Sequence, residues 1–255
     1  MVNFGEIPIE KILQCEFENI GIRVAFKKEN FIEAIEFCRQ IKEKGYKLFI
    51  NPQQTIIYTT SEFLNCIEKV NEISPYALTL VDTSGSMKKQ DVLSLFYMAE
   101  KHMNKNINIG FHSHNNLKLS FSNAQALMEQ HTERILIIDT TVFGMGRGAG
   151  NICTEHMTKY LNDNYGTSYN LLPILKTIDE NINPIFVKTP WGYSVPYYLA
   201  ALNYCHPNYA KFLIDKKSVS IEVINDILKR IPQDKKSTYD EKFISQMLEE
   251  TKVVV

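Results

Sequence analysis

The sequence predicts an α/β protein with a parallel sheet, and two patterns in its first 150 residues lead to this prediction. Five short apolar runs recur along the chain, and an amphipathic segment follows each of the first four. The runs are almost continuously apolar, which is typical of strands buried on both faces of a parallel sheet. Alternation of strands and helices at this interval favours right-handed βαβ units. The predicted strands are 21–26, 46–51, 77–82, 107–112 and 134–139.

The segments between the strands are predicted helices because their apolar residues repeat at helical spacing. Segment 30–45 starts at a candidate N-cap, Asn30, and ends at Gly45, a residue typical of helix termination. Ser61 is the expected cap of the next helix. The other helices predicted in this part of the chain are 61–74, 88–104 and 117–130.

After about residue 150 the pattern changes from alternating strands and helices to helices alone. Prolines, Pro184 among them, separate these predicted helices, and no further buried strand is evident. We therefore expect an α/β domain over residues 1–165 and a helical C-terminal region over residues 166–255. The helices predicted after residue 150 are 153–164, 169–180, 194–204, 206–215, 219–230 and 240–250.

Composition and charge argue against several classes of protein. The chain has 255 residues, 44% of them apolar, so it can bury a full core, and its net charge of −1 is unlike that of a general nucleic-acid binder. No apolar run reaches the ~18 residues of a membrane span, and the N-terminus lacks the features of a signal peptide. Five cysteines without a CxxC pair suit free thiols in a reducing compartment. We expect a cytoplasmic protein that binds neither nucleic acid nor a membrane.

Polar residues occur at the carboxyl ends of the predicted strands, where the loops of parallel α/β proteins converge on one crevice. Asn51 ends the second strand, Asp82 and Thr83 follow the third, and Asp139 ends the last. The Thr83 hydroxyl could hold a substrate carboxylate, and Asp82 could orient that hydroxyl or a metal-bound water. A turn residue followed by a helix cap explains Asp82 and Thr83 equally well.

His112 and His114 are the most informative pair in the sequence. Residues two apart on a strand point to the same face, so both imidazoles can reach one ion. Neutral imidazole is a common ligand of divalent metals. The alternative is a pair of polar residues that cap a loop, but their position at a strand's carboxyl end favours a metal site.

A glycine-rich segment, residues 144–151, follows the last predicted strand. Its four glycines allow close backbone approach and expose N–H groups to a ligand. It is not a P-loop, because no Gly-Lys-Ser/Thr follows, and a tight strand-to-helix turn also explains it. Asn151 could cap the following helix or offer its amide oxygen to a metal. Arg147 could contact an anion or be a solvated loop charge.

Together these segments resemble the HMGL-like family of DRE-TIM metallolyases, and most closely its members of the 4-hydroxy-2-oxovalerate aldolase type. Residues 110–124 are similar to the family's seventh-strand motif with two histidines, 144–155 to the loop after its eighth strand, and 81–87 to the end of its sixth. The resemblance covers about residues 1–165, and 190–213 are more loosely similar to the C-terminal helical segment of aldolase-type members. It implies a TIM-barrel-type (β/α) sheet.

The resemblance also implies roles for individual residues. His112 and His114 would be metal ligands, and Asn151 matches a further ligand of some members. Thr83 would bind the substrate carboxylate, and Tyr193 would lie near the segment that covers the site. The metal would be Mn²⁺, Mg²⁺ or Co²⁺, chelated by a 2-oxo acid such as pyruvate, and as a Lewis acid it would stabilise the enolate. The candidate substrate-binding residues are thus Thr83, Asp82, Asn51, Arg147 and Tyr193.

One family motif is absent from this sequence. The family opens with a strand that carries Asp-Arg-Glu or a close variant, which supplies a metal ligand and an enolate-stabilising arginine. If the histidines mark the seventh strand, the five runs are strands four to eight of eight, and residues 1–4 would end the third. We therefore expect an N-terminally incomplete barrel, with that arginine and the general base in a missing segment. A fragment of a longer aldolase is favoured over units supplied by another polypeptide or an inactive remnant.

The sequence thus predicts a metal-dependent carbon–carbon lyase that acts next to a 2-oxo acid, with an aldehyde as the second reactant. The alternative is a non-catalytic remnant or subunit whose open sheet edge pairs with a second copy or a partner chain. Either case leads us to expect an oligomer. A nucleotide-binding α/β protein would need a phosphate loop that the sequence does not contain.

Overall fold

The computed structural model describes residues 1–17, 19–216 and 219–253, and they form two compact units. The first unit contains Met1–Asp82, Met87–His112 and Asn123–Asp139. The second contains Thr83–Ser86, Ser113–Ser122 and Thr140–Val255. The domain boundary expected at residue 165 stays a prediction.

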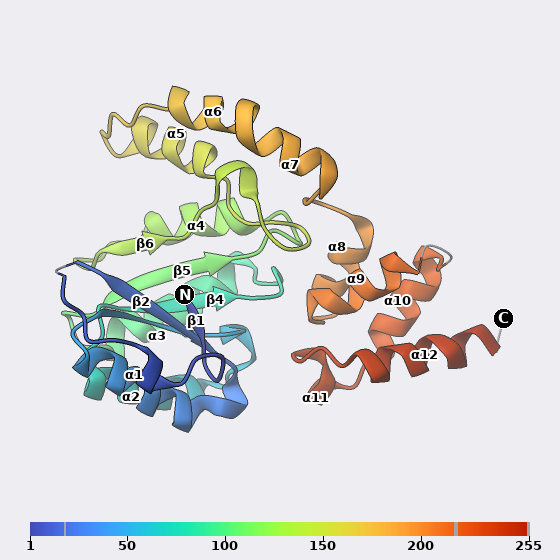
Figure 1. Cartoon of the computed structure of the whole chain (residues 1–255), viewed down its shortest axis with the longest axis horizontal. Coiled ribbons are helices and arrows are strands. Elements are labelled where there is room, and N and C mark those ends of the chain that lie inside the picture. Colours follow the sequence, from blue (N-terminus) through green and yellow to red (C-terminus); the bar gives the residue numbers. More distant parts are fainter. Residues whose placement is uncertain (18, 217–218, 254–255) are drawn as a thin grey trace. The chain divides into compact units, whose positions relative to one another are not determined.

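Six parallel strands form one open sheet, in which each strand lies next to its neighbour in the chain (Figure 1). This order is the one found in (β/α) barrels, so the α/β, TIM-barrel-type fold predicted from the sequence is confirmed. All five predicted strands are present within two residues of their expected ends, and the sixth, β1, is the short strand expected near residues 1–4. The strands are β1 (Val2–Asn3), β2 (Gly21–Phe26), β3 (Lys47–Pro52), β4 (Ala77–Asp82), β5 (Asn108–Ser113) and β6 (Leu136–Ile138).

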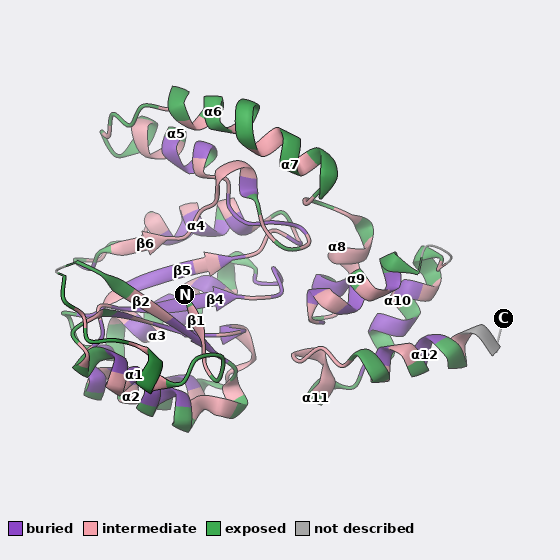
Figure 2. Cartoon of the chain, in the orientation of Figure 1, coloured by how far each residue is buried: buried purple, intermediate pink, exposed green. Residues whose placement is uncertain are grey.

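The burial of the strands agrees with their apolar sequences. All six residues of β4 are buried, and β2 and β3 each bury their last three residues (Figure 2). The residues of β6, which lies at an edge of the described sheet, are all only partly buried, and Ile135 just before it is 57% exposed. One edge of the sheet therefore presents apolar side chains to its surroundings.

Helices connect the strands of the first unit. They are α1 (Phe31–Glu43), α2 (Thr60–Ile73), α3 (Lys89–His102) and α4 (Ser120–Met128), the last of which begins in the second unit. Helix α2 packs between α1 and α3. Short 3₁₀ helices occur at Ile9–Lys11, Lys28–Asn30, Thr55–Ile57 and Val142–Gly144.

Helix α2 is capped by Thr59, so the prediction that Ser61 caps it is wrong. The Glu62 backbone N–H donates to Thr59 Oγ1 at 3.3 Å, and the Thr59 N–H donates to the Glu62 carboxylate at 2.8 Å. This reciprocal capping box requires a Ser or Thr three residues before Glu. Thr59 meets that spacing with Glu62, whereas Ser61 does not.

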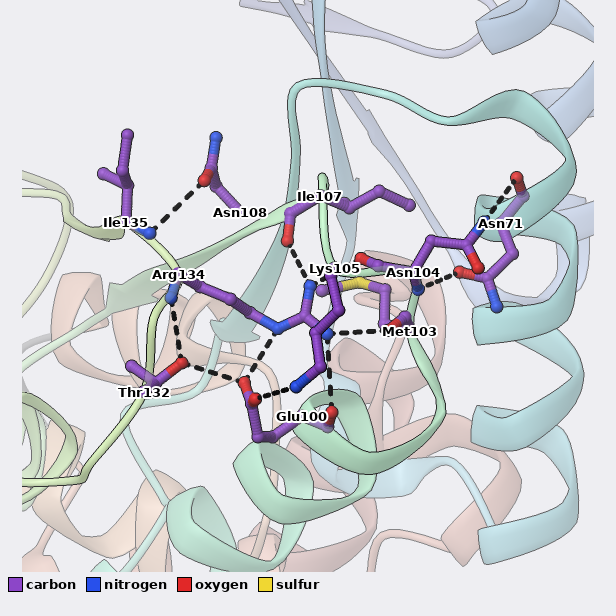
Figure 3. Close-up of polar contacts among 10 residues, drawn as sticks. All are labelled: Asn71, Glu100, Met103, Asn104, Lys105, Ile107, Asn108, Thr132, Arg134 and Ile135. Carbon is purple, nitrogen blue, oxygen red and sulfur yellow. Dashed lines mark hydrogen bonds and ion pairs between the residues drawn. The ribbon is translucent and has the colours of Figure 1, made fainter.

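A buried arginine, Arg134, organises the chain between α3 and the start of β5 (Figure 3). Its side chain is 1% exposed. Its Nη1 donates to the carbonyls of Asn104 and Ile107, and its Nη2 donates to the carbonyl of Met103, each at 2.6 Å. These carbonyls follow the last turn of α3, and Arg134 supplies each of them with a side-chain donor where the chain leaves the helix. Arg134 thus has a structural role at the amino-terminal ends of the strands.

The second unit is mostly helical. A core of buried side chains joins four of its helices, and Tyr209, Ile227 and Ile244 are fully buried there. None of the helices that the structure describes is long and apolar enough to cross a membrane. The helices are α5 (Thr154–Asn164), α6 (Leu172–Thr177), α7 (Asn183–Lys188), α8 (Val195–Leu202), α9 (Pro207–Asp215), α10 (Ile221–Arg230), α11 (Gln233–Lys236) and α12 (Glu241–Val253).

The helical path continues through Pro184, where the sequence predicted a break. A π-helical stretch, Ile178–Ile182, joins α6 to α7, and Pro184 lies in the first turn of α7. Proline lacks an N–H donor and crowds the preceding turn, and a wide π turn accommodates both effects. Along 172–188, all of it described, no residue is buried (Figure 2).

Candidate functional site

In the first unit, three charged or polar side chains that are far apart along the chain meet on the sheet. Arg23 lies on β2, His112 on β5, and Asp139 directly follows β6. The Arg23 guanidinium binds both carboxylate oxygens of Asp139, with Nη2 at 2.9 Å from Oδ1. His112 Nδ1 lies 3.0 Å from Asp139 Oδ2. We call these three residues the Arg–Asp–His cluster.

The cluster shows that the sheet is strongly curled. Three strands lie between β2 and β6. With strands spaced ~4.8 Å apart, a flat sheet would separate β2 from β6 by roughly 19 Å, farther than the side chains of Arg23 and Asp139 can span. Because the two side chains are in direct contact, both project from the concave face of a curled sheet.

The cluster also determines the charge of Asp139. Burial by itself would raise the pKa of the Asp139 carboxyl, but hydrogen bonds from His112 and Arg23 outweigh it and hold the pKa below its usual value. The side chains of Arg23 and Asp139 are 24% and 17% exposed. An ionised carboxylate therefore lies beside the His112 ring.

Two more predicted residues lie in the first unit. Asn51 is 3% exposed, and its Oδ1 has no hydrogen-bond partner among the residues that the structure describes. It pairs in register with Ala25, two residues beyond Arg23, so it shares the face that carries Arg23. Asp82 is buried, and its Oδ2 accepts a hydrogen bond from the Met87 N–H at 3.0 Å. This bond favours the turn interpretation of Asp82.

In the second unit, His114 and Asn151 lie side by side. Their backbones form an antiparallel β-bridge, and the Asn115 N–H donates to the Gly150 carbonyl at 3.0 Å. The Asn151 side chain donates from Nδ2 to the Met145 carbonyl at 2.9 Å. Its Oδ1 is buried and has no hydrogen-bond partner in the described part of the chain.

Asn151 does not cap the following helix, so that alternative from the sequence is wrong. Helix α5 begins at Thr154, and Cys153 occupies the N-cap position. The bridge to His114 instead holds Asn151 in extended chain before the helix. A buried amide oxygen without a donor among the described residues is suited to bind a ligand, because buried polar atoms are rarely left unpaired.

The glycine-rich segment folds tightly around Asn151. A Cβ on Gly146 would lie 2.1 Å from Asn151 Nδ2, and a Cβ on Gly150 would lie 2.3 Å from the Gly144 carbonyl oxygen. The glycines are therefore required by the turn itself. Arg147 lies on the same turn and is exposed.

The segment before α8 packs on this turn. Trp191 Nε1 donates to the Phe143 carbonyl at 3.0 Å, and the Gly192 N–H donates to the Gly148 carbonyl at 2.9 Å. Tyr193 follows directly, with its ring 4.7 Å from Lys118 Nζ. The second unit thus brings the candidate covering residue onto the loop that follows His114.

Thr83 belongs to the short Thr83–Ser86 stretch of the second unit. The Gly85 carbonyl accepts a hydrogen bond from Leu117 N–H at 3.2 Å. A Cβ on Gly85 would lie 2.7 Å from the His114 carbonyl oxygen, so this stretch packs closely against the loop after β5. Thr83 is partly exposed there.

The predicted residues divide between the two units. The first unit holds Asn51, Asp82 and His112, and the second holds Thr83, His114, Arg147, Asn151 and Tyr193. Ser113 is 1% exposed and lies between two partly exposed histidines, as expected where alternate residues of an extended chain share one side. The described residues contain no group of three or more His, Cys, Asp or Glu that could hold a metal ion. A metal at the predicted position would therefore also rely on the Asn151 amide oxygen.

Sequence reasoning missed the part played by Arg23 and Asp139. Asp139 was noted only as a polar strand end, and Arg23 only as part of an apolar run. An arginine inside a strand that is otherwise apolar was the available signal, because a buried charge requires a partner.

The curled sheet and the polar strand ends define a barrel-type α/β protein with its candidate site at the carboxyl ends of the strands. Residues 18–179 match the model of the HMGL-like family. The chain belongs to this family.

Named relatives share parts of the chain. It is 32% identical over 107 residues to a 4-hydroxy-2-oxovalerate aldolase of Geobacillus genomosp. 3. The aligned segment covers 42% of this chain and 30% of the relative. It is 25% identical to the homocitrate synthase of Pyrococcus horikoshii over 69% of this chain and 51% of the relative. An oxaloacetate decarboxylase of Mycobacterium tuberculosis is 22% identical, over 52% and 38% of the two chains. The chain thus spans about a third to a half of the length of these relatives.

Solved structures share the fold. The N-terminal domain of a candidate aldolase from Bacteroides vulgatus has a TM-score of 0.67 and 26% identity, over 80% of this chain and 66% of that chain. Pyruvate carboxylase of Rhizobium etli has a TM-score of 0.69 over 92% of this chain and 25% of that chain. At 14% identity, the second similarity shows the fold alone.

Proposed function

We propose that this chain carries part of the active site of a divalent-metal-dependent lyase that makes or breaks a C–C bond next to a 2-oxo acid. Membership of the HMGL-like family supports a carbon–carbon lyase, and its relatives include an aldolase and a decarboxylase. The observation that carries the proposal is the buried Asn151 Oδ1, which lacks a hydrogen-bond partner in the described chain and lies on the residue bridged to His114.

The donor set suits a divalent metal. His112 and His114 would supply imidazole nitrogens, and Asn151 would supply an amide oxygen. A mixed set of this kind is compatible with Mn²⁺ or Co²⁺, whereas Mg²⁺ would depend more on oxygen ligands from substrate and water. When bound, the cation would act as a Lewis acid that favours the negative charge developing on the keto oxygen of a 2-oxo acid.

The other candidate residues would act on the substrate directly. The Thr83 hydroxyl would donate to the substrate carboxylate, and the Arg147 guanidinium would add a positive charge beside the glycine-rich turn. Asn51 and Asp82 would line the site from the strand ends. Tyr193, anchored on Lys118, would limit access of water from the side of α8. The aldehyde, the general base and the enolate-stabilising arginine stay predictions.

Metal binding and proton exchange test the proposal together. We would titrate the chain with Co²⁺ and Mn²⁺ by calorimetry and follow exchange of the pyruvate methyl protons with D₂O by NMR. His112→Ala, His114→Ala and Asn151→Leu should each weaken metal binding at least 10-fold, as expected for loss of one of three protein ligands. His131→Ala is the matched control, because His131 is exposed and outside the candidate site. Metal binding that survives all three site variants would overturn the proposal.

A second function is favoured by one observation, the partly buried β6 edge with the exposed Ile135 beside it. In this alternative the chain is a non-catalytic subunit whose sheet edge pairs with a second copy or a partner chain. Parent protein that binds no metal, and whose self-association is lost on Ile135→Lys, would favour this function.

A further inference from the structure

We propose that Asp139 is a positioning residue for His112. Held by Arg23, its carboxylate fixes the His112 ring as the Nδ1–H tautomer, so that Nε2 carries the lone pair for a metal ion. The inference rests on the proposed function, in which His112 is a ligand.

The direction of the hydrogen bond follows from the charges. The Arg23 guanidinium is a donor only, and it binds both oxygens of Asp139. The paired carboxylate is therefore ionised and can only accept hydrogen bonds. Because Asp139 Oδ2 lies 3.0 Å from His112 Nδ1, the ring must donate from Nδ1. In a neutral imidazole the lone pair is then on Nε2.

Arg23 holds the carboxylate in one orientation. Its guanidinium contacts the carboxylate through two nitrogens and lies 5.5 Å from the centre of the Phe49 ring on the neighbouring strand. A bidentate contact fixes the plane of a carboxylate, which a single contact does not. Arg23, on β2, and Asp139, after β6, thus orient a ring that projects from β5.

A carboxylate behind a histidine ligand fixes the tautomer, raises the basicity of the ligand and orients the ring. The elements of such an arrangement are present here around His112. We therefore expect that removing the Asp139 carboxylate changes the His112 tautomer in a protein that is still folded.

NMR of the histidine side chains tests the inference without reference to catalysis. In ¹⁵N-labelled protein without added metal, His112 should show the protonated Nδ1 and unprotonated Nε2 pattern, assigned by its loss in His112→Gln. Asp139→Ala should convert His112 to a mixture dominated by Nε2–H. Asp139→Asn keeps an acceptor without the charge and should give an intermediate pattern. Arg23→Lys keeps the charge without the two-nitrogen contact and should restore only part of what Arg23→Gln loses.

Co²⁺ affinity gives the second measurement. Asp139→Ala should weaken binding by about 10- to 100-fold, the range typical of outer-shell partners of metal ligands. Glu72→Ala is the matched control in the same unit, since it removes a carboxylate from an exposed ion pair with Lys69. Unfolding midpoints of both variants separate a positioning role from loss of folding.

The outcomes distinguish this inference from the proposed function. If His112→Ala abolishes metal binding while Asp139→Ala leaves both the affinity and the tautomer unchanged, the inference is wrong and the proposed function stands. If the parent binds no metal but Asp139→Ala still switches the tautomer, the proposed function fails and the positioning by Asp139 holds.

Discussion

The Arg134 guanidinium donates from Nε to the Glu100 carboxylate at 2.7 Å while its other nitrogens hold the carbonyls that follow α3. The buried Arg134 side chain thus connects three segments: the end of α3, the residues before β5 and the residues before β6. These segments lie at the amino-terminal ends of the strands, whereas the candidate site is predicted at the carboxyl ends.

Replacing Arg134 by Met should destabilise the protein strongly. The change removes the side-chain donor of the Met103 and Ile107 carbonyls and one of the donors of the Glu100 carboxylate, which keeps its bonds from Thr132 and Lys105. Breaking a buried ion pair by removing one partner costs about 3–5 kcal/mol. Urea unfolding followed by circular dichroism measures the loss. Lys105→Ala is the control, because Lys105 is 74% exposed where it meets Glu100, and it should cost less than ~1 kcal/mol. Equal effects of the two variants would contradict this account of Arg134.

The lowered pKa of the Glu62 carboxyl predicts how the stability of the protein depends on pH. Hydrogen bonds from Lys28 and Thr59 lower the pKa of Glu62 from 4.5 to about 2. Because the folded pKa lies below the unfolded value, the stabilisation is fully present above about pH 4.5 and is lost as the pH falls towards 2. The difference in unfolding free energy between the parent and Glu62→Gln should therefore shrink across this window. Glu68→Gln, at an exposed position of α2, serves as control, and a difference that does not change with pH would refute the prediction.

Gly146→Ala should disturb the candidate site through Asn151. The added methyl would lie 2.1 Å from Asn151 Nδ2, so the amide must move and give up its hydrogen bond to Met145. Overpacking of this kind costs about 1–3 kcal/mol, and Co²⁺ affinity should fall with it. Gly166→Ala is the comparison, because Gly166 has a φ of +66° but no neighbour within 4 Å of an added Cβ. That variant should lose some stability and keep its metal affinity.

Binding of a 2-oxo acid should be visible in Trp191 fluorescence. Trp191 is the single tryptophan of the chain and lies two residues before Tyr193. Pyruvate added to Mg²⁺-loaded protein should change its emission, and Thr83→Val should raise the apparent Kd about 10- to 100-fold, since a hydrogen bond to a charged group contributes ~1.5–3 kcal/mol. Thr177→Val removes a hydroxyl that bonds only locally, to Pro173, and should leave the Kd unchanged. An unaltered Kd in Thr83→Val would remove Thr83 from the substrate site.

The strands could be predicted because each is a short run of neighbouring apolar residues, and such a run is itself the signal for a buried strand. A run such as 77–82 is apolar at nearly every position, and the structure buries all six of its residues. Helix boundaries were less accurate: α2 starts after Thr59 because of a side-chain exchange with Glu62, and a nearby Ser61 looked equally suitable. The π turn before Pro184 depends on how the backbone relaxes around a proline, which residue type alone does not specify.

The candidate site was predictable in part for the same reason. His112 and His114 are close in sequence, so strand periodicity was enough to put them forward as a pair. The role of Arg23 and Asp139 depends on the curvature of the sheet, which brings together residues four strands apart. Spacing along the chain carries no information of that kind.

The long separation of Arg23 from Asp139, 116 residues, has a consequence for folding. A contact between distant parts of a chain closes a long loop, and the entropy lost in that closure must be offset before the contact stabilises the fold. During synthesis, His112 emerges before the residue that orients it, so its ring acquires a fixed orientation only once β6 has docked at the end of the sheet. Formation of the Arg–Asp–His cluster is thus coupled to completion of the curled sheet.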